Sequence, residues 1–255
     1  MIREEARLFV CAVQFLTRIP TPQLAGFRPE WIQRSARYYP LVGQVVGGAA
    51  ALVLYGAAQV WNPWIAALLA VSAGVVLTGG FHEDGLADTA DGLGGGLTRD
   101  RRLEIMKDSR LGSYGALALG LTLALRVAAL AMLTQVSPLL AAVALLAANG
   151  LGRAAAVGAM AVMPYGGDPG MAKEGRPDRA SPLGLTVAVL IALWPLVFFS
   201  PVTGAGGVAL GLLLGAVPVW LAWRLIGGRT GDVLGAVEQA FEVGFLLAVA
   251  GLAVG

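Results

Sequence analysis

Apolar stretches long enough to cross a membrane recur from residue 41 to residue 254 of this 255-residue chain. A hydrocarbon core of about 30 Å requires roughly 20 apolar helical residues, because an unpaired backbone group inside it costs several kcal/mol. Only 13% of the residues are charged, against about a quarter in soluble domains. We therefore expect an all-α, polytopic membrane bundle that forms one catalytic domain over residues 1–255. Seven spans are predicted, at residues 41–59, 63–79, 113–133, 138–163, 183–201, 206–225 and 237–254.

The N-terminal residues 2–16 differ from these spans. They mix Arg3, Glu4, Glu5 and Arg7 with apolar side chains, which is typical of a helix that lies at the membrane interface. The single cysteine, Cys11, excludes an intramolecular disulfide and a cysteine-based zinc site. The net charge of +2 is too small to indicate a nucleic-acid partner.

Lysine and arginine are distributed unevenly between the loops. Six precede the first predicted span, five lie in residues 80–112, three in residues 164–182, and Arg224 and Arg229 lie near the end of the sixth span. The opposite loops contain none. Because cytoplasmic loops accumulate these residues, we expect the N-terminus and all charged loops in the cytoplasm. The chemistry is then expected on the cytoplasmic face.

Three aspartates in residues 79–96 define a carboxylate stripe. Asp84, Asp88 and Asp91 stand at i, i+4 and i+7. Around a helix, Asp88 therefore lies about 40° to one side of Asp84, and Asp91 lies about 20° to the other side. Carboxylates this close repel one another, and a bound cation would compensate; a solvated charged loop is the alternative. Hard oxygen ligands favour Mg²⁺, with Mn²⁺ also compatible. Asp84 and Asp88 are candidate metal ligands, and Asp91 is either a third ligand or the general base.

A basic stretch follows the stripe and ends at residues 107–112. Lys107 and Arg110 flank Asp108, and cations beside a carboxylate-bound metal suit a phosphate or diphosphate substrate. We treat both cations as candidate phosphate ligands and Asp108 as a second candidate catalytic carboxylate. For the arginines between residues 99 and 102 we favour a purely topological role of positive charge.

Ionisable residues also fall within or beside apolar spans. Arg126, Arg153 and Glu242 lie inside them, where a charge is costly unless it is paired or hydrated. Arg153 and Glu242 are candidate substrate-binding groups, or else partners in an internal ion pair. Asp232 is either a helix N-cap or a further metal ligand. The lone histidine, His82, is a polar contact, a substrate ligand or a proton carrier. We expect Arg153, Asp232 and Glu242 to share one cytoplasmic cavity with the carboxylate stripe.

Several longer motifs run through most of the chain. They are FLTRIP at residues 15–20, YPLVG at 39–43, GFHEDGLADTADG at 80–92, LEIMKDSRLG at 103–112 and TGDVLGA at 230–236, followed by Glu242. With these motifs the sequence resembles the cobalamin synthase family, the adenosylcobinamide-GDP ribazoletransferases. Glu83 stands where that family has an apolar residue, and residues 164–182 match its pattern weakly.

The resemblance implies a magnesium-dependent transfer late in cobalamin biosynthesis. A ribose hydroxyl of α-ribazole, or of its 5′-phosphate, attacks the cobinamide-linked phosphorus of adenosylcobinamide-GDP and releases GMP. Such a displacement depends mainly on charge neutralisation, which metal-binding carboxylates and basic side chains supply. The resemblance also implies a multi-pass protein of a bacterial or archaeal cytoplasmic membrane. It leaves open whether the protein acts as a homo-oligomer or in a complex with other cobalamin-pathway enzymes.

Two other functions are compatible with parts of the pattern. The spacing DGxxDxxD in a membrane helix is similar to that of CDP-alcohol phosphotransferases, which would use a CDP-lipid donor. A cation-coupled transporter would use the same aspartates near the bilayer midplane. Transport is the less favoured alternative, because the predicted outer loops are short and uncharged.

Overall fold

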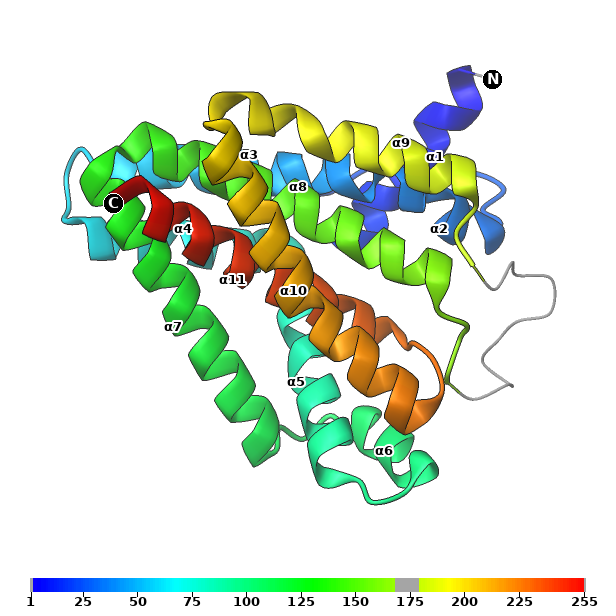
Figure 1. Cartoon of the computed structure of the whole chain (residues 1–255). Helices are drawn as coiled ribbons and strands as arrows, with labels where there is room; N and C mark the ends of the chain where they lie inside the picture. Colours follow the sequence, from blue (N-terminus) through cyan, green and yellow to red (C-terminus); the bar gives the residue numbers. More distant parts are fainter. Residues whose placement is uncertain (1, 168–178, 255) are drawn as a thin grey trace.

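The computed structural model describes residues 2–167 and 179–254, which form eleven α-helices and two 3₁₀ helices (Figure 1). In chain order they are α1 (Ile2–Leu16), α2 (Glu30–Arg34), η1 (Ser35–Tyr38), α3 (Tyr39–Ala57), α4 (Pro63–Thr78), α5 (Phe81–Gly95), α6 (Arg99–Met106), α7 (Ser113–Val136), α8 (Pro138–Val162), α9 (Pro182–Leu193), η3 (Trp194–Phe198), α10 (Pro201–Ile226) and α11 (Gly231–Val254). The prediction of an all-α bundle is confirmed, and each predicted span coincides with a helix. The N-terminal helix also has the predicted bounds.

The number of spans differs from the predicted seven. Five helices in the described part are long and apolar enough to cross a membrane, or six if α4 and α5 together form one broken span. The predicted spans at residues 63–79 and 183–201 fall on α4 and α9, with 16 and 12 residues. Both helices are shorter than the roughly 20 residues that a bilayer requires. The count of seven is therefore not confirmed.

A sharp turn separates α4 from α5. Gly79 and Gly80 both have φ +70°, a left-handed conformation that glycine adopts without steric cost. The two helices consequently differ in direction by 88°. The apolar α4 therefore ends at this turn, and the polar α5 starts in a new direction.

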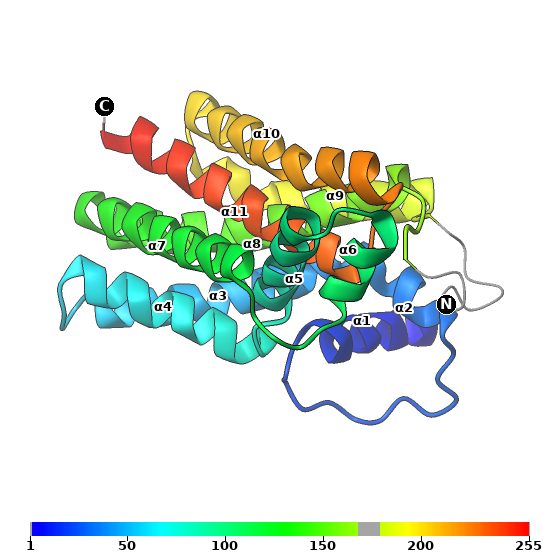
Figure 2. The same cartoon turned by 90° about the horizontal axis from the view of Figure 1, so that it is seen from below.

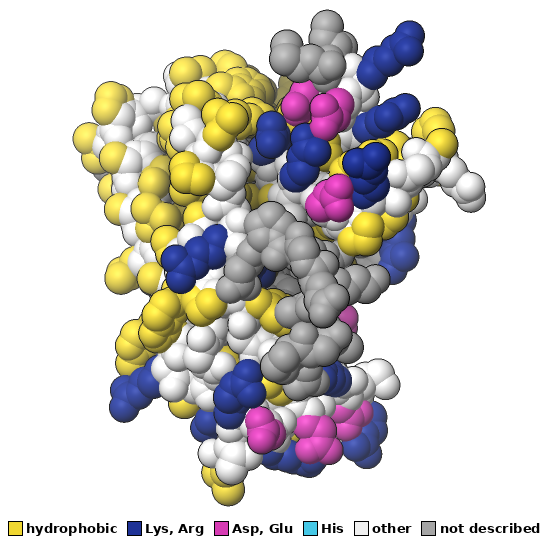
Figure 3. Space-filling model, turned by 90° about the vertical axis from the view of Figure 1, so that its right-hand side faces the viewer, with side chains coloured by type: hydrophobic (Ala, Val, Ile, Leu, Met, Phe, Trp, Pro, Cys, Tyr) yellow, Lys and Arg dark blue, Asp and Glu magenta, His cyan; other side chains and the backbone are white. Residues whose placement is uncertain are grey.

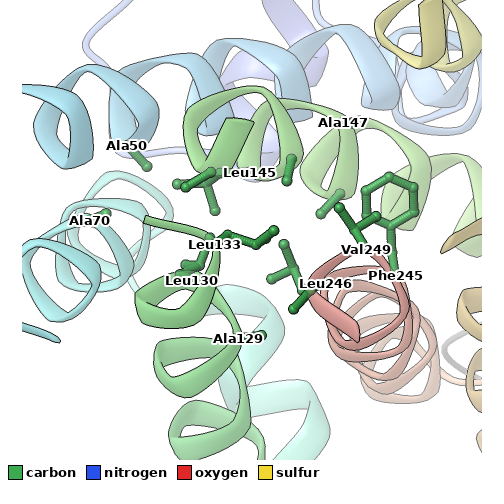
Figure 4. Packing of buried hydrophobic residues seen from close by; sticks show 14 of the residues in the cluster. Ala50, Ala70, Ala129, Leu130, Leu133, Leu145, Ala147, Phe245, Leu246 and Val249 are labelled. Atoms are coloured by element: carbon green, nitrogen blue, oxygen red, sulfur yellow. The ribbon is translucent and has the colours of Figure 1, made fainter. Parts of the chain in front are cut away.

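The bundle packs closely around α8 and α11. A Cβ added to Gly43 of α3 would lie 2.4 Å from the carbonyl oxygen of Asn149, and one added to Gly47 would lie 2.9 Å from the Cβ of Asn149. Only glycine therefore lets α3 approach α8 this closely. Figure 4 shows the buried cluster that α3, α4, α7, α8 and α11 share, including Leu130, Leu145 and Leu246. These contacts hold the helices that carry the charged residues in fixed positions.

Charged side chains gather at one end of the molecule. Figure 3 looks onto this end, where Lys, Arg, Asp and Glu side chains cover much of the surface. In Figure 1 the same end holds α1, α2 and α6, whereas the C-terminus and the turn between α7 and α8 lie at the opposite end. The turns at residues 58–62, 137 and 199–200 contain no charged residue. The described helices thus have one polar end and one apolar end.

Candidate functional site

The carboxylate stripe lies on α5, as its spacing predicts. Asp84 is exposed, Asp88 is half-buried and Asp91 is buried. Glu83 and Asp84 stand in the first turn, where the positive end of the helix dipole stabilises negative charge. The stripe therefore runs from an exposed end at Asp84 to a buried end at Asp91.

Two glycines bring Asp232 of α11 to this stripe. An added Cβ on Gly85 would lie 2.9 Å from the carbonyl oxygen of Asp232, and one on Gly235 would lie 3.0 Å from that of His82. The backbones of α5 and the first turn of α11 are thus in direct contact. Asp232 comes from a segment almost 150 residues away in the chain and joins the carboxylates of α5.

Asp84, Asp88 and Asp232 form an acidic group that has no basic partner among the described residues. The charges of Asp84, Asp232 and Asp91 all act on Asp88, and that of Asp84 acts on Asp232. Within residues 2–167 and 179–254, none of these three side chains forms an ion pair, and no three His, Cys, Asp or Glu side chains already surround a common point. Three neighbouring carboxylates without a cation fit a hard divalent ion in donor type and charge. Their role as metal ligands remains a prediction.

Asp91 has a clear structural contact. The backbone N–H of Gly112 donates to its Oδ2 at 2.8 Å, and that of Gly115 donates to its Oδ1 at 2.9 Å. Gly112 is the N-cap of α7 and has no side chain with which to cap it. Asp91 therefore satisfies N–H groups at the start of α7 that would otherwise lack partners. Each oxygen keeps a further lone pair, so its predicted roles as ligand or base stay open.

The contact to Gly112 holds the predicted phosphate-binding segment beside the stripe. Lys107 is the C-cap of α6, and Arg110 pairs with Asp108 through an Nη2 to Oδ2 distance of 2.5 Å. The hydrogen bonds from the side chain and the backbone of Arg110 lower the pKa of Asp108 to about 2. Asp108 is consequently a weak base, and Arg110 is partly neutralised, although its side chain is 87% exposed.

Arg153 and Glu242 lie in a buried ion cluster, which we define as Glu83, Arg126, Arg153, Glu238 and Glu242. Nη1 of Arg153 is 2.8 Å from Oε1 of Glu238 and 3.6 Å from Oε1 of Glu242. Nη2 of Arg126 is 2.7 Å from Oε2 of Glu242, and its Nη1 is 3.2 Å from Oε1 of Glu83. Arg153 and Glu242 form the ion pair that was predicted from the sequence as the alternative to substrate binding, and their binding of substrate remains a prediction. Two guanidinium groups thus face three carboxylates in the middle of the bundle.

The buried ion cluster joins the stripe through α5. Glu83 belongs to the cluster, and the next residue, Asp84, begins the stripe. His82 is also buried and lies within electrostatic range of Arg153 and Glu242. Its contact to a substrate remains a prediction. The residues that were expected to share one cavity therefore lie in two adjoining groups. Asp232 belongs to the acidic group on α5, and Arg153 and Glu242 belong to the buried ion cluster.

Two members of the cluster that were not selected as site residues, Glu238 and Arg126, could have been found from the sequence. Glu238 and Glu242 are spaced i, i+4, which puts both on one face of α11, and Arg126 needs a partner because it lies within a span. The pairing with Glu83 has no such sequence signal. It depends on the position of α5 relative to α7.

An apolar cavity lies on the other face of α5. It has a volume of about 520 Å³ between α5, α7, α10 and α11, and its lining includes Leu86, Leu93 and Pro218. Thr89 and Thr122 are its polar lining side chains. Phosphate groups require charged or multiple polar donors, so the stripe side of α5 is the better site for them.

The glycine contact between α5 and α11 leads to a first prediction. Gly85→Ala places a Cβ against the backbone of Asp232, and such overpacking typically costs about 1–3 kcal/mol. We expect a corresponding decrease in the free energy of unfolding, measured by denaturation in detergent. Gly95→Ala is the control, since its Cβ would meet its nearest neighbour at 3.8 Å. Equal stability of both variants would contradict the close contact.

Comparison with known proteins gives a consistent result. The family described as Cobalamin-5-phosphate synthase matches residues 8–250. Proteins named adenosylcobinamide-GDP ribazoletransferase from Leptothrix cholodnii and Azorhizobium caulinodans are 48% and 45% identical, with 94% and 93% of this chain and 93% of each relative aligned. One from Shewanella piezotolerans is 42% identical over 94% of this chain and 93% of its own length. No solved structure matches the chain.

Proposed function

The chain belongs to the cobalamin-5-phosphate synthase family, and on this premise we propose that it is an adenosylcobinamide-GDP ribazoletransferase of late cobalamin biosynthesis. In this reaction the cobinamide phosphate moiety of adenosylcobinamide-GDP passes to α-ribazole or its 5′-phosphate, and GMP leaves. The observation that supports the chemistry is the group of Asp84, Asp88 and Asp232, which has no basic partner in the described residues. We propose that these carboxylates hold Mg²⁺.

Different side chains would serve different steps of a phosphoryl-type displacement. A bound divalent ion would neutralise the diphosphate and stabilise the departing phosphate. Lys107 and Arg110 stand next to the stripe through the Asp91 contact to Gly112, where they can hold phosphate oxygens. The attacking hydroxyl must lose a proton as its oxygen bonds to phosphorus and the bond to GMP breaks. Since Asp108 is a weak base, a carboxylate of the stripe is the better acceptor.

The proposed activity is tested by GMP release. Purified protein in detergent is supplied with adenosylcobinamide-GDP, with and without α-ribazole and Mg²⁺. We expect GMP only when donor, acceptor and metal are all present. Use of a CDP-lipid donor with no reaction of adenosylcobinamide-GDP would instead identify a CDP-alcohol phosphotransferase.

We further propose that the polar end faces the cytoplasm, since it carries the lysine and arginine excess. Arg101→Cys in intact cells should then resist a membrane-impermeant thiol reagent. Val60→Cys, at the opposite end and 72% exposed, is the matched control and should react. The native Cys11 is 3% exposed and adds little background. Labelling at residue 101 but not at residue 60 would reverse the orientation.

A further inference from the structure

The end of α1 docks at the junction between α4 and α5. The rings of Phe15 and Phe81 meet edge to face, with their centroids 5.3 Å apart. The backbone N–H of Arg18 donates to the carbonyl oxygen of Leu77 at 2.7 Å. Figure 2 shows the C-terminal end of α1 next to this junction. Residues of the FLTRIP motif, which have no role in the reaction as proposed above, are therefore fixed at the start of α5.

The docking site is on the same side of α5 as the stripe. Phe81, Asp84 and Asp88 are spaced i, i+3 and i+7, which places them on one face of the helix. Because Phe15 packs on Phe81, the segment that follows Phe15 approaches α5 from this face. Asp84 is four residues beyond Gly80, about 6 Å along the helix axis. The segment that contains Arg18 thus meets the N-terminal end of α5, the end from which the stripe begins.

The side chain of Arg18 is held by packing on glycine. A Cβ added to Gly79 would lie 2.3 Å from Nε of Arg18 and 3.2 Å from its Cζ. The guanidinium therefore lies directly over Gly79 and would be displaced by any larger residue. Its position is set by packing on Gly79 and by the backbone hydrogen bond to Leu77, with no contribution from a carboxylate of the described residues.

The guanidinium of Arg18 is exposed, and no polar partner is recorded for it within residues 2–167 and 179–254. The other arginines near the site are engaged. Arg126 and Arg153 pair within the buried ion cluster, and Arg110 pairs with Asp108. Arg102 donates to the carbonyl of Leu225. An arginine that packs on Gly79, before the helix that carries the carboxylates, and that has no partner among the described residues is suited to a bidentate contact with an anion.

We propose that Arg18 is a substrate-binding residue that holds a phosphate of the nucleoside diphosphate donor. The proposal rests on the proposed function and adds a cation at the end of the stripe opposite the segment of Lys107 and Arg110. The diphosphate then lies along the stripe, between basic groups from two distant parts of the chain. Arg18 would supply a phosphate contact of the kind for which Arg153, paired in the buried ion cluster, is also a candidate.

The test separates substrate binding from folding. Arg18→Gln should raise the KM for adenosylcobinamide-GDP about ten- to a hundredfold, as loss of a charge-assisted contact does, with kcat changed less. Arg18→Lys keeps the positive charge but lacks the bidentate guanidinium, so we expect a smaller increase in KM. Arg7→Gln, at an exposed arginine of α1, is the matched control and should have the wild-type KM. Thermal unfolding in detergent shows which variants are folded.

The outcomes are distinct. A folded Arg18→Gln protein with an unchanged KM overturns the proposal. A lower kcat that reflects only a smaller fraction of active protein, with the wild-type KM, overturns it as well. If Arg18→Gln does not fold, Arg18→Lys decides in the same way. A wild-type protein that releases no GMP contradicts the proposed function instead. In that case the dissociation constant for GDP, with Mg²⁺ present, still tests Arg18, and equal values for wild type and Arg18→Gln overturn its role.

Discussion

Asp84→Asn is expected to lower the kcat for GMP release by about 10²- to 10⁴-fold, the range associated with loss of a positioned charge in catalysis. The change removes one negative charge from the acidic group of Asp84, Asp88 and Asp232 and leaves its shape nearly intact. Asp84 is exposed and has no ion pair in the described structure. Folding and membrane insertion should therefore be unaffected. The measurement is turnover at saturating donor and acceptor over a range of Mg²⁺ concentrations.

The matched control for this variant is Asp100→Asn. Asp100 lies on α6, its side chain is 93% exposed, and its one recorded contact is with Arg99 at 3.4 Å. We expect wild-type turnover, because its charge is well screened by solvent. Normal turnover of Asp84→Asn at saturating Mg²⁺ would remove Asp84 from the proposed metal site.

Arg153→Ala is expected to decrease the free energy of unfolding by about 3–5 kcal/mol, since removing one partner of a buried pair leaves a charge uncompensated. The side chain of Arg153 is 3% exposed, and that of its partner Glu238 is 1% exposed. After the substitution, one guanidinium would face three carboxylates. Denaturation in detergent and the yield of folded protein measure the effect.

A double variant separates stability from substrate binding. Arg153→Met combined with Glu238→Gln removes both charges of the pair, so much of the stability should return. If Arg153 also contacts phosphate, the KM for the donor stays high in this variant. If Arg153 only balances charge, donor affinity returns along with stability. Wild-type stability of Arg153→Ala would contradict the buried ion pair.

Local features of the site could be predicted from the sequence, and tertiary ones could not. The alignment of Asp84, Asp88 and Asp91 follows from helical periodicity alone, and the structure reproduces it. The approach of Asp232 depends on Gly85 and Gly235 in two separate helices, and glycine has many uses that spacing does not distinguish. The capping of α7 by Asp91 similarly joins residues 21 and 24 positions apart. Such contacts depend on how the helices pack.

The predicted count of seven spans is not confirmed for a related reason. A hydropathy pattern measures apolar length, and it does not register the direction in which a helix continues. Residues 63–79 are apolar enough for a span, but two successive left-handed glycines end α4 after 16 residues. Residues 183–201 contain Pro195, and the α-helix gives way there to the 3₁₀ helix η3, since proline removes a backbone donor.

The bend at Gly79 and Gly80 has a consequence for how the chain enters the membrane during synthesis. A straight continuation of α4 would carry the acidic residues of α5 along the direction of insertion into hydrocarbon. Each aspartate at the centre of the bilayer costs roughly 2.5–3.5 kcal/mol on insertion scales. With an 88° turn, the insertion machinery can release α4 into lipid while α5 remains at the aqueous boundary. Two adjacent glycines thus separate an apolar segment that is suited to lipid from an acidic segment that is suited to water.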